Sequence, residues 1–327
     1  MTSKVTASAP GKVVLSGEYA VLDGAPAVCM AVNRRARVEL GTIDSEFSEV
    51  TAPGFTDAIG RFKSSGNDVQ WQDGQASFAV LDAVWSVVDS GSAGARAINL
   101  DSTDFIDSAT EQKIGIGSSA AITVALCAAT TNSADVAVLS PLAQRAHAKL
   151  QGGAGSGVDI ACSLAGGLIE YRMQGASVTA LKWPKGLSYR LLWSGVAADT
   201  REKLSKLAAG INKPSRQHLL SAAESMAAAW RSNDANQVIA EYRAYCEHLL
   251  KFSVDHDLGI FDAGHAELWH AAGTAGLIYK PCGAGGGDVG ILLGTDDAEL
   301  EAFIVTHAAN TSVLDCEMSP TGVRIEV

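Results

Sequence analysis

The sequence predicts an α+β protein with a sizeable buried core. Strand-like and helix-like segments follow one another in mixed order, without the regular βαβ repetition of a doubly wound sheet. Hydrophobic residues make up 47% of the 327-residue chain and charged residues 19%, which excludes intrinsic disorder. The length suggests about two domains. We place the boundary near Trp183–Gly186, which divides the chain into residues 1–185 and 186–327.

The first third of the chain is typical of strands separated by turns. Three runs are rich in Val and alternate in places, namely Lys4–Ser8, Lys12–Ser16 and Pro26–Leu40. Residues 41–75 are polar and irregular and predict no regular element. Ala76–Val88 has helical spacing, and Ala95–Leu100 predicts another strand.

Helices predominate in the rest of the chain. Ser118–Thr131 is apolar and Ala-rich, and its two leading serines are natural N-cap residues. Ser140-Pro141 predicts a cap and an N1 proline for a helix that ends at Leu150. Further helices are predicted at Ser215–Ser232, Ala235–Phe252, Asp262–Ala275 and Asp297–Ala309, and strands at Gly167–Met173, Tyr189–Ser194, Asp288–Leu293 and Val323–Val327.

The charge and the cysteines restrict the class of protein. The formal net charge is −11, so the surface repels phosphate backbones, and we expect no nucleic-acid partner and no docking to anionic membranes. We find no secretory signal and no apolar run near the roughly 20 residues that cross a bilayer, which predicts a cytoplasmic protein. None of the six cysteines forms a CxxC pair, so reduced, buried thiols are expected.

Glycine makes up 33 of the 327 residues, and much of it lies in three loops. They are Gly115–Ala120, Gly152–Asp159 and Gly283–Asp288. Glycine permits positive φ and lets the backbone approach a ligand closely. Each loop is therefore a candidate anion site lined by backbone, although each taken alone also fits an ordinary turn.

The first loop leads directly into the predicted helix Ser118–Thr131. Free N–H groups and the helix dipole favour phosphate at such an N-terminus, and the two serine hydroxyls can cap the helix, contact phosphate or ligate Mg²⁺. The alternative is a tight turn with an ordinary N-cap. A dinucleotide fingerprint is disfavoured, because the loop follows the polar Asp101–Glu111 stretch instead of a strand. No GxxxxGKS/T occurs, which excludes a P-loop.

Two charged residues beside glycine-rich segments are candidates for chemistry. Asp159 ends the second loop, where a carboxylate can act as a general base or anchor a cation, or can simply form an Asx turn or cap. Lys12 begins an apolar strand, where lysine is usually a solvated end but can also direct a fixed charge into a cleft. In an acidic protein that binds anions, such local cations must supply the attraction.

Taken together, these segments resemble the GHMP kinase superfamily. Three motifs carry the resemblance, Ala9–Leu22 (APGKVVLSGEYAVL), Lys113–Ala121 (KIGIGSSAA) and Lys280–Gly290 (KPCGAGGGDVG). Within the superfamily the chain is most similar to the phosphomevalonate kinases. That similarity rests on Ala146–Ala161 (AHAKLQGGAGSGVDIA), on Trp193-Ser194-Gly195 with Ala198 and Thr200, and on Asp288 after three glycines.

The resemblance implies a fold and an activity. The fold is an N-terminal domain of the ribosomal S5 domain 2-like type packed against a ferredoxin-like C-terminal domain, with ATP and substrate in the cleft between them. The activity is the ATP-dependent phosphorylation of (R)-5-phosphomevalonate to 5-diphosphomevalonate, with Mg²⁺, in the mevalonate pathway of isoprenoid biosynthesis. The resemblance is compatible with a monomer or a homodimer.

The resemblance also assigns roles to residues. Lys12 and Asp159 are the implied catalytic pair, and Ser119 is the implied metal ligand. The implied cofactor-binding residues are Gly115, Ile116, Gly117, Ser118, Ser119, Ala120, Gly285 and Gly286. The implied substrate-binding residues are Glu18, Tyr19, Ser156, Gly157, Gly283, Ala284 and Lys113.

The sequence departs from the family pattern in three places, one of which is Val289 after Asp288, where the family commonly has a cysteine. Gly152-Gly153 stands where the family often carries Gly-Lys, so Lys149, Arg145 or Lys113 would have to supply the missing charge. Mevalonate kinases place a Mg²⁺-binding glutamate in the helix before the Asp loop, whereas this segment offers Gln144 and His147 but no acid.

Two alternatives to phosphomevalonate phosphorylation stay open. One keeps the superfamily and changes the acceptor to mevalonate or another small alcohol. The other is a metabolite-binding protein that has kept the fold and lost catalysis. Such a protein would be expected to lack Lys12, Asp159 or the loop serines, all of which are present.

Overall fold

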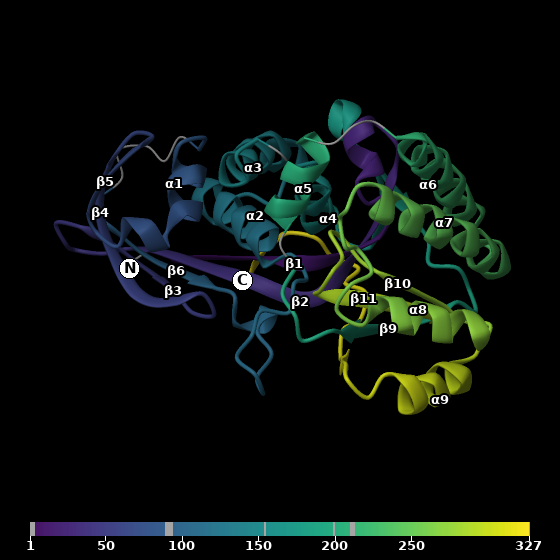
Figure 1. Ribbon diagram of the computed structural model, residues 1–327. Helices are drawn as coiled ribbons and strands as arrows, with labels where there is room; N and C mark the ends of the chain where they lie inside the picture. Colours follow the sequence, from purple (N-terminus) through teal and green to yellow (C-terminus); the bar gives the residue numbers. More distant parts are fainter. Residues whose placement is uncertain (1–3, 89–93, 154, 199, 210–212, 327) are drawn as a thin grey trace.

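The computed structural model describes residues 4–88, 94–153, 155–198, 200–209 and 213–326 and contains two β-sheets flanked by helices (Figure 1). The larger sheet has the strand order β13-β1-β2-β6-β3-β4-β5, with β7 paired to β2 and β8 to β7. Its strands are β1 Lys4–Ser16, β2 Ala27–Thr42, β3 Ser48–Ala52, β4 Thr56–Ser65, β5 Asp68–Asp73, β6 Arg96–Asp101, β7 Leu168–Arg172, β8 Ser177–Leu181 and β13 Arg324–Glu326.

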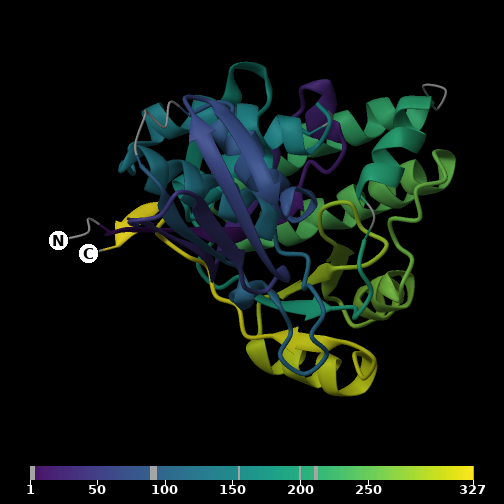
Figure 2. The same ribbon diagram turned by 90° about the vertical axis from the view of Figure 1, so that its left-hand side faces the viewer.

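The second sheet is antiparallel and has the order β10-β11-β9-β12. Its strands are β9 Ser188–Trp193, β10 Ile278–Pro281, β11 Val289–Gly294 and β12 Ser312–Leu314. The chain passes from the first sheet to the second between Leu181 and Ser188, and it returns at the end, where β13 pairs with β1 (Figure 2). We keep the division at residues 185 and 186 as a proposal.

Helices cover both sheets. Those of the first two-thirds are α1 Ala79–Trp85, α2 Ser118–Thr131, α3 Val136–Leu150, α4 Val158–Ala165 and α5 Thr200–Ala209. Those of the last third are α6 Pro214–Ser232, α7 Ala235–Asp255, α8 His265–Thr274 and α9 Asp297–His307. Helices α2, α3 and α4 lie on one side of the β1–β2 strands, and α8 and α9 flank the second sheet (Figure 1). None of the helices in the described ranges is long and apolar enough to cross a bilayer.

A hydrophobic core joins the two sheets. It contains Val13 and Met30 from the large sheet, Leu191 from the second sheet, and Trp230 and Tyr242 from the α6–α7 pair. All six cysteines are free and buried, which confirms the expectation of reduced thiols. The mixed architecture confirms the predicted α+β class.

Strand β1 is one continuous element, where the sequence predicts two strands. The register against β2 shifts between Pro10 and Gly11. Proline has no N–H to donate to a ladder, so it is tolerated at such a bulge. The irregularity therefore explains the apparent break in the pattern, and it lies directly before Lys12.

Two other predictions are wrong. Residues 41–75 contain β3, β4 and β5 instead of irregular chain. Strand β4 buries only Gly60 and Phe62, and β5 buries none of its residues, so these two strands carry little of the apolar alternation that marks a strand. The helix expected to start at Ser140-Pro141 begins at Val136, because the side chain of Asp135 caps it by accepting from the N–H of Ala137 at 2.9 Å.

Candidate active site

The first glycine loop presents the uncapped N-terminus of α2. Gly115 and Gly117 have φ values of 87° and 86°, a region that favours glycine. Gly117 is the N-cap, in place of the predicted serine, and it offers no side-chain cap. The N–H groups of the first helical turn are therefore free to meet an anion, with Ser118 and Ser119 in the same turn.

The backbone of β1 holds this loop against Lys12. The N–H of Lys12 donates to the carbonyl oxygen of Ile116 at 2.8 Å. Gly11 permits this approach, because a Cβ there would lie 2.6 Å from the same oxygen. A Cβ at Gly117 would lie 2.9 Å from Cε of Lys12, so the lysine side chain lies directly against the first glycine loop, Gly115–Ala120, which we call the phosphate loop.

Lys12 and Asp159 form an ion pair within the site. Lys12 Nζ lies 3.2 Å from Asp159 Oδ1, and the two side chains are 11% and 29% exposed. Burial by itself lowers the pKa of Lys12, but the neighbouring Asp159 carboxylate opposes this effect. The pKa of Lys12 is raised overall, so the lysine stays charged. Asp159 lies in the first turn of α4, where the helix dipole favours a carboxylate. Gln144 holds this turn by donating to the carbonyl oxygen of Gly157 at 3.0 Å.

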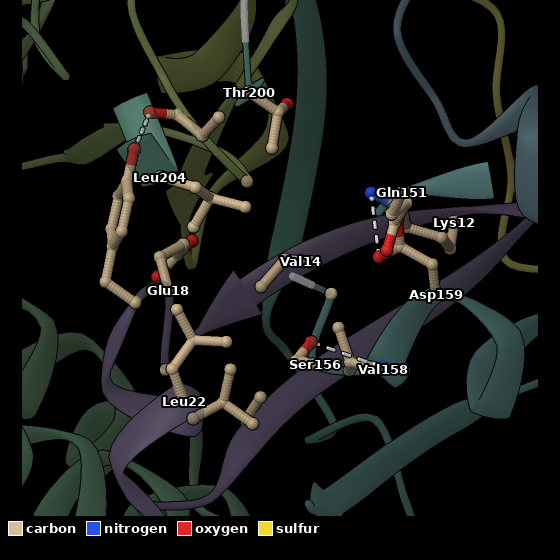
Figure 3. A pocket seen from close by; sticks show the side chains of 18 of the residues that line it. Lys12, Val14, Glu18, Leu22, Gln151, Ser156, Val158, Asp159, Thr200 and Leu204 are labelled. Atoms are coloured by element: carbon tan, nitrogen blue, oxygen red, sulfur yellow. Dashed lines mark hydrogen bonds and ion pairs between the residues drawn. The ribbon is translucent and has the colours of Figure 1, made fainter. Parts of the chain in front are cut away.

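Two adjoining cavities meet at the Lys12–Asp159 pair. One, which we call the phosphate cavity, is lined by the phosphate loop, from Gly115 to Ala120. The other is lined by residues 17–19, 21–22 and 155–159 and by Leu204 of α5 (Figure 3). The residues that line both cavities include Lys12, Asp159, His147, Thr200, Gly283 and Ala284. A group bound in one cavity would therefore face a group bound in the other across the ion pair.

The third glycine loop closes over this junction and is tied down at several points. The hydroxyl of Tyr19 donates to the carbonyl oxygen of Ala284 at 2.7 Å. The N–H of Gly286 donates to the carbonyl oxygen of Ile260 at 2.7 Å. Gly285 and Gly286 pack against Ile260 and Lys203 and are not among the described residues that line the two cavities.

Asp288, at the end of this loop, reaches the phosphate loop. A Cβ at Gly115 would lie 2.1 Å from Cγ of Asp288, so only glycine leaves room for the carboxylate. The N–H of Ala198 donates to its Oδ1 at 3.2 Å. Partial burial raises the pKa of Asp288, against the lowering effect of that hydrogen bond and of the lysines around it.

Glu18 has both carboxylate oxygens occupied by protein partners. Lys280 Nζ lies 2.5 Å from its Oε1, and the hydroxyl of Tyr245 donates to its Oε2 at 2.6 Å. The side chains of Lys280 and Glu18 are 0% and 1% exposed. The hydroxyl of Tyr245 also accepts from the N–H of Gly17 at 2.7 Å. This buried cluster joins the end of β1 to α7 and β10, so Glu18 contributes to the cavity wall while its charge serves the fold.

Only one of the three cations proposed to replace the family lysine lines the site. Lys113 lines the phosphate cavity. Lys149 donates to Ser86 Oγ at 2.6 Å, and Arg145 donates to the carbonyl oxygen of Pro141, so both side chains make contacts outside the two cavities.

His147 lies on α3, in the segment where the family resemblance implies an acidic metal ligand. Its Nε2 lies 3.4 Å from Ser119 Oγ, and burial lowers its pKa, which favours the neutral ring. The sequence motif placed His147 near the Asp loop, but nothing in the motif indicated contact with Ser119.

Ser156, in the second glycine loop, is fixed through its backbone. Its carbonyl oxygen accepts a hydrogen bond from the hydroxyl of Tyr171 at 2.9 Å.

Comparisons with known proteins extend over the whole chain. Residues 80–167 match the model of the GHMP kinases N terminal domain. A phosphomevalonate kinase of Streptomyces sp. (strain CL190) is 29% identical, covering 95% of this chain and 96% of the relative. A mevalonate kinase of Thermococcus gammatolerans is 27% identical, covering 99% and 98%.

The fold has solved counterparts. The Streptococcus pneumoniae phosphomevalonate kinase in complex with phosphomevalonate and AMPPNP superposes with a TM-score of 0.78 at 18% identity, covering 97% of this chain and 99% of that one. This likeness confirms the fold predicted from the three motifs. Residues 80–167 thus match the N-terminal domain of the GHMP kinases, and the chain as a whole is similar to phosphomevalonate and mevalonate kinases.

Proposed function

We propose that the protein transfers the terminal phosphoryl group of ATP to (R)-5-phosphomevalonate, giving 5-diphosphomevalonate and ADP. The observation that carries the proposal is the junction of two cavities at the Lys12–Asp159 pair, with the uncapped N-terminus of α2 in one of them. The similarity to the Streptomyces phosphomevalonate kinase over 95% of the chain supports the choice of acceptor.

In this proposal the phosphate loop binds the nucleotide and the second cavity binds the acceptor. Phosphoryl transfer depends mostly on positioning and on neutralising charge. An acceptor phosphate is already anionic near neutral pH and needs little help from a base. Lys12 then draws two anions together, and Asp159 chiefly orients Lys12 through the 3.2 Å contact.

The described charges of the phosphate cavity leave a need for a further cation. Its lysines, Lys12 and Lys113, are balanced by its two carboxylates, Asp159 and Asp288. A bound triphosphate would therefore remain uncompensated. The serine hydroxyls and carboxylates are oxygen donors of the kind Mg²⁺ uses alongside nucleotide phosphates. Mg²⁺ entering with ATP fits these residues and would neutralise phosphate charge.

One observation favours mevalonate as a second candidate acceptor. Among the described residues, Lys12 is the only lysine or arginine that lines the acceptor cavity. The negative charge of a second phosphate there could be neutralised only by Lys12 and by Lys113 of the adjoining cavity, among the described lysines and arginines that line the two cavities. Mevalonate, which carries an alcohol at the reacting position, demands less positive charge, and the similarity to the Thermococcus mevalonate kinase is consistent with it.

Product analysis with a panel of acceptors tests the proposal. The purified protein is incubated with ATP, Mg²⁺ and either mevalonate or 5-phosphomevalonate, and the products are separated and identified by ³¹P NMR. We expect 5-diphosphomevalonate from 5-phosphomevalonate. Phosphorylation of mevalonate alone would replace the first candidate by the second, and nucleotide binding without transfer to any acceptor would favour a binding protein.

A further inference from the structure

The carboxylate of Asp288 lies at the phosphate cavity without an ion-pair partner. No described lysine or arginine forms a salt bridge with it, whereas the other carboxylate of the cavity, Asp159, is paired with Lys12. Its one described hydrogen bond comes from the N–H of Ala198 to Oδ1. A partly buried carboxylate with so few partners is costly unless something else compensates its charge.

The backbone fixes this carboxylate in place. The N–H of Asp288 donates to the carbonyl oxygen of Val196 at 2.6 Å, and its own carbonyl accepts from the N–H of Ser194 at 2.9 Å. Asp288 has a φ of 52°, which is uncommon for a residue with a side chain and points to an over-determined position. The contact with Gly115 then places the carboxylate at the first residue of the phosphate loop.

A carboxylate in this place would repel nucleotide phosphates unless a cation lies between them. Mg²⁺ is usually held by one or two carboxylates together with nucleotide phosphates and waters. Asp159 is engaged by Lys12, and helix α3 presents His147 in the segment where the resemblance implies an acid. The described residues contain no cluster of three or more acidic, His or Cys side chains that would hold a metal alone. The metal should therefore bind only together with the nucleotide.

Resting on the kinase function above, we propose that Asp288 is the acidic protein ligand of the divalent cation that enters with ATP. The hydroxyl of Ser119, which lines the same cavity, is available as a second ligand. The acidic ligand then comes from the third glycine loop and not from helix α3. It also gives the close contact between Gly115 and Asp288 a function, since it brings the carboxylate to the bound phosphates.

The test is metal binding in the presence of a nucleotide that cannot react. The affinity for Mn²⁺ is measured by electron paramagnetic resonance with saturating AMPPNP, for the wild type, Asp288→Asn and Asp159→Asn. We expect Asp288→Asn to weaken Mn²⁺ binding by about tenfold or more, and Asp159→Asn, which removes the same charge from the same cavity, to weaken it much less. Equal Mn²⁺ affinity in the wild type and Asp288→Asn, or loss of affinity in Asp159→Asn alone, would overturn the proposal.

A second measurement separates ligation from a structural role. Asparagine can still accept from the N–H of Ala198, and it removes a partly buried charge, so Asp288→Asn should unfold at a Tm no lower than the wild type without ligands. The increase in Tm given by Mn²⁺ with AMPPNP should be smaller in the variant. An undiminished increase would contradict ligation. Neither readout involves an acceptor, so a wrong acceptor in the proposed function would leave this result standing.

Discussion

His265 donates a hydrogen bond from Nε2 to the carbonyl oxygen of Gly287 across 3.0 Å, and its Nδ1 lies 2.8 Å from the hydroxyl of Tyr279. A carbonyl oxygen only accepts, so Nε2 carries the hydrogen and Nδ1 accepts from the tyrosine. Burial lowers the pKa of His265 and favours this neutral form. The imidazole thus holds the glycine loop one residue before Asp288.

Replacing His265 should impair nucleotide use without removing a reacting group. His265→Leu loses the donor to Gly287, whereas His265→Gln retains an amide donor that can replace it. We expect kcat/KM for ATP to fall about tenfold in the leucine variant, which corresponds to the loss of a buried hydrogen bond, and to recover largely in the glutamine variant. Steady-state kinetics with varied ATP check this. A folded leucine variant with wild-type kcat/KM would refute the positioning role.

The buried histidines make stability depend on pH. Burial lowers the pKa of both His147 and His265, so the unfolded chain binds more protons than the folded chain just below the ordinary value of 6.5. The free energy of unfolding should therefore decrease as pH falls through this range and be retained above it. Urea unfolding between pH 8 and 5 measures the slope. The slope should be shallower for His265→Gln, and an identical slope would contradict the assignment.

Gly115→Ala should damage the phosphate site. A Cβ would lie 2.1 Å from Cγ of Asp288, and the φ of 87° is itself unfavourable for alanine. We expect AMPPNP binding to weaken by about tenfold or more, equivalent to the roughly 1–3 kcal/mol of a strained backbone position. Calorimetric titration gives the affinity. Gly41→Ala is the control, because nothing lies within 4 Å of a Cβ there, and a Gly115 variant that bound as well as this control would argue against the close contact.

Lys280→Met should destabilise the fold more than any surface substitution. It leaves the buried carboxylate of Glu18 with only the Tyr245 hydroxyl, and breaking a buried pair on one side costs about 3–5 kcal/mol. The double variant Glu18→Gln/Lys280→Met should recover part of this loss, because no buried charge remains. Urea unfolding gives both values. A double variant less stable than Lys280→Met would contradict the argument.

The sequence predicted the parts of the site that follow from local pattern. The glycines around Ser118 and Ser119 predict a phosphate loop before a helix, and the structure places that loop at the start of α2. Lys12 and Asp159 are separated by 147 positions, and only the family resemblance paired them; their 3.2 Å contact follows from the packing of α4 on β1. Local sequence pattern therefore predicts the loop and the helix that follows it, whereas the contact between Lys12 and Asp159 depends on how distant segments pack together.

What the sequence missed arises from long-range contacts. Glu18 was assigned to the substrate because nothing in its own segment shows that Lys280 and Tyr245 engage both carboxylate oxygens. The contact of His265 with the carbonyl oxygen of Gly287 could not be identified from helical spacing. Strands β4 and β5 were missed because their exposed faces are polar and only a few of their residues reach the core.

The central claim is that transfer takes place at the junction of the two cavities, with Lys12 as the cation that brings the anions together. The most direct test is the kcat of Lys12→Met at saturating ATP, Mg²⁺ and 5-phosphomevalonate, with Asp159→Asn measured beside it. Because charge neutralisation outweighs proton removal here, we expect no detectable turnover in Lys12→Met and a smaller loss in Asp159→Asn. A kcat for Lys12→Met comparable to that of the wild type would contradict the account.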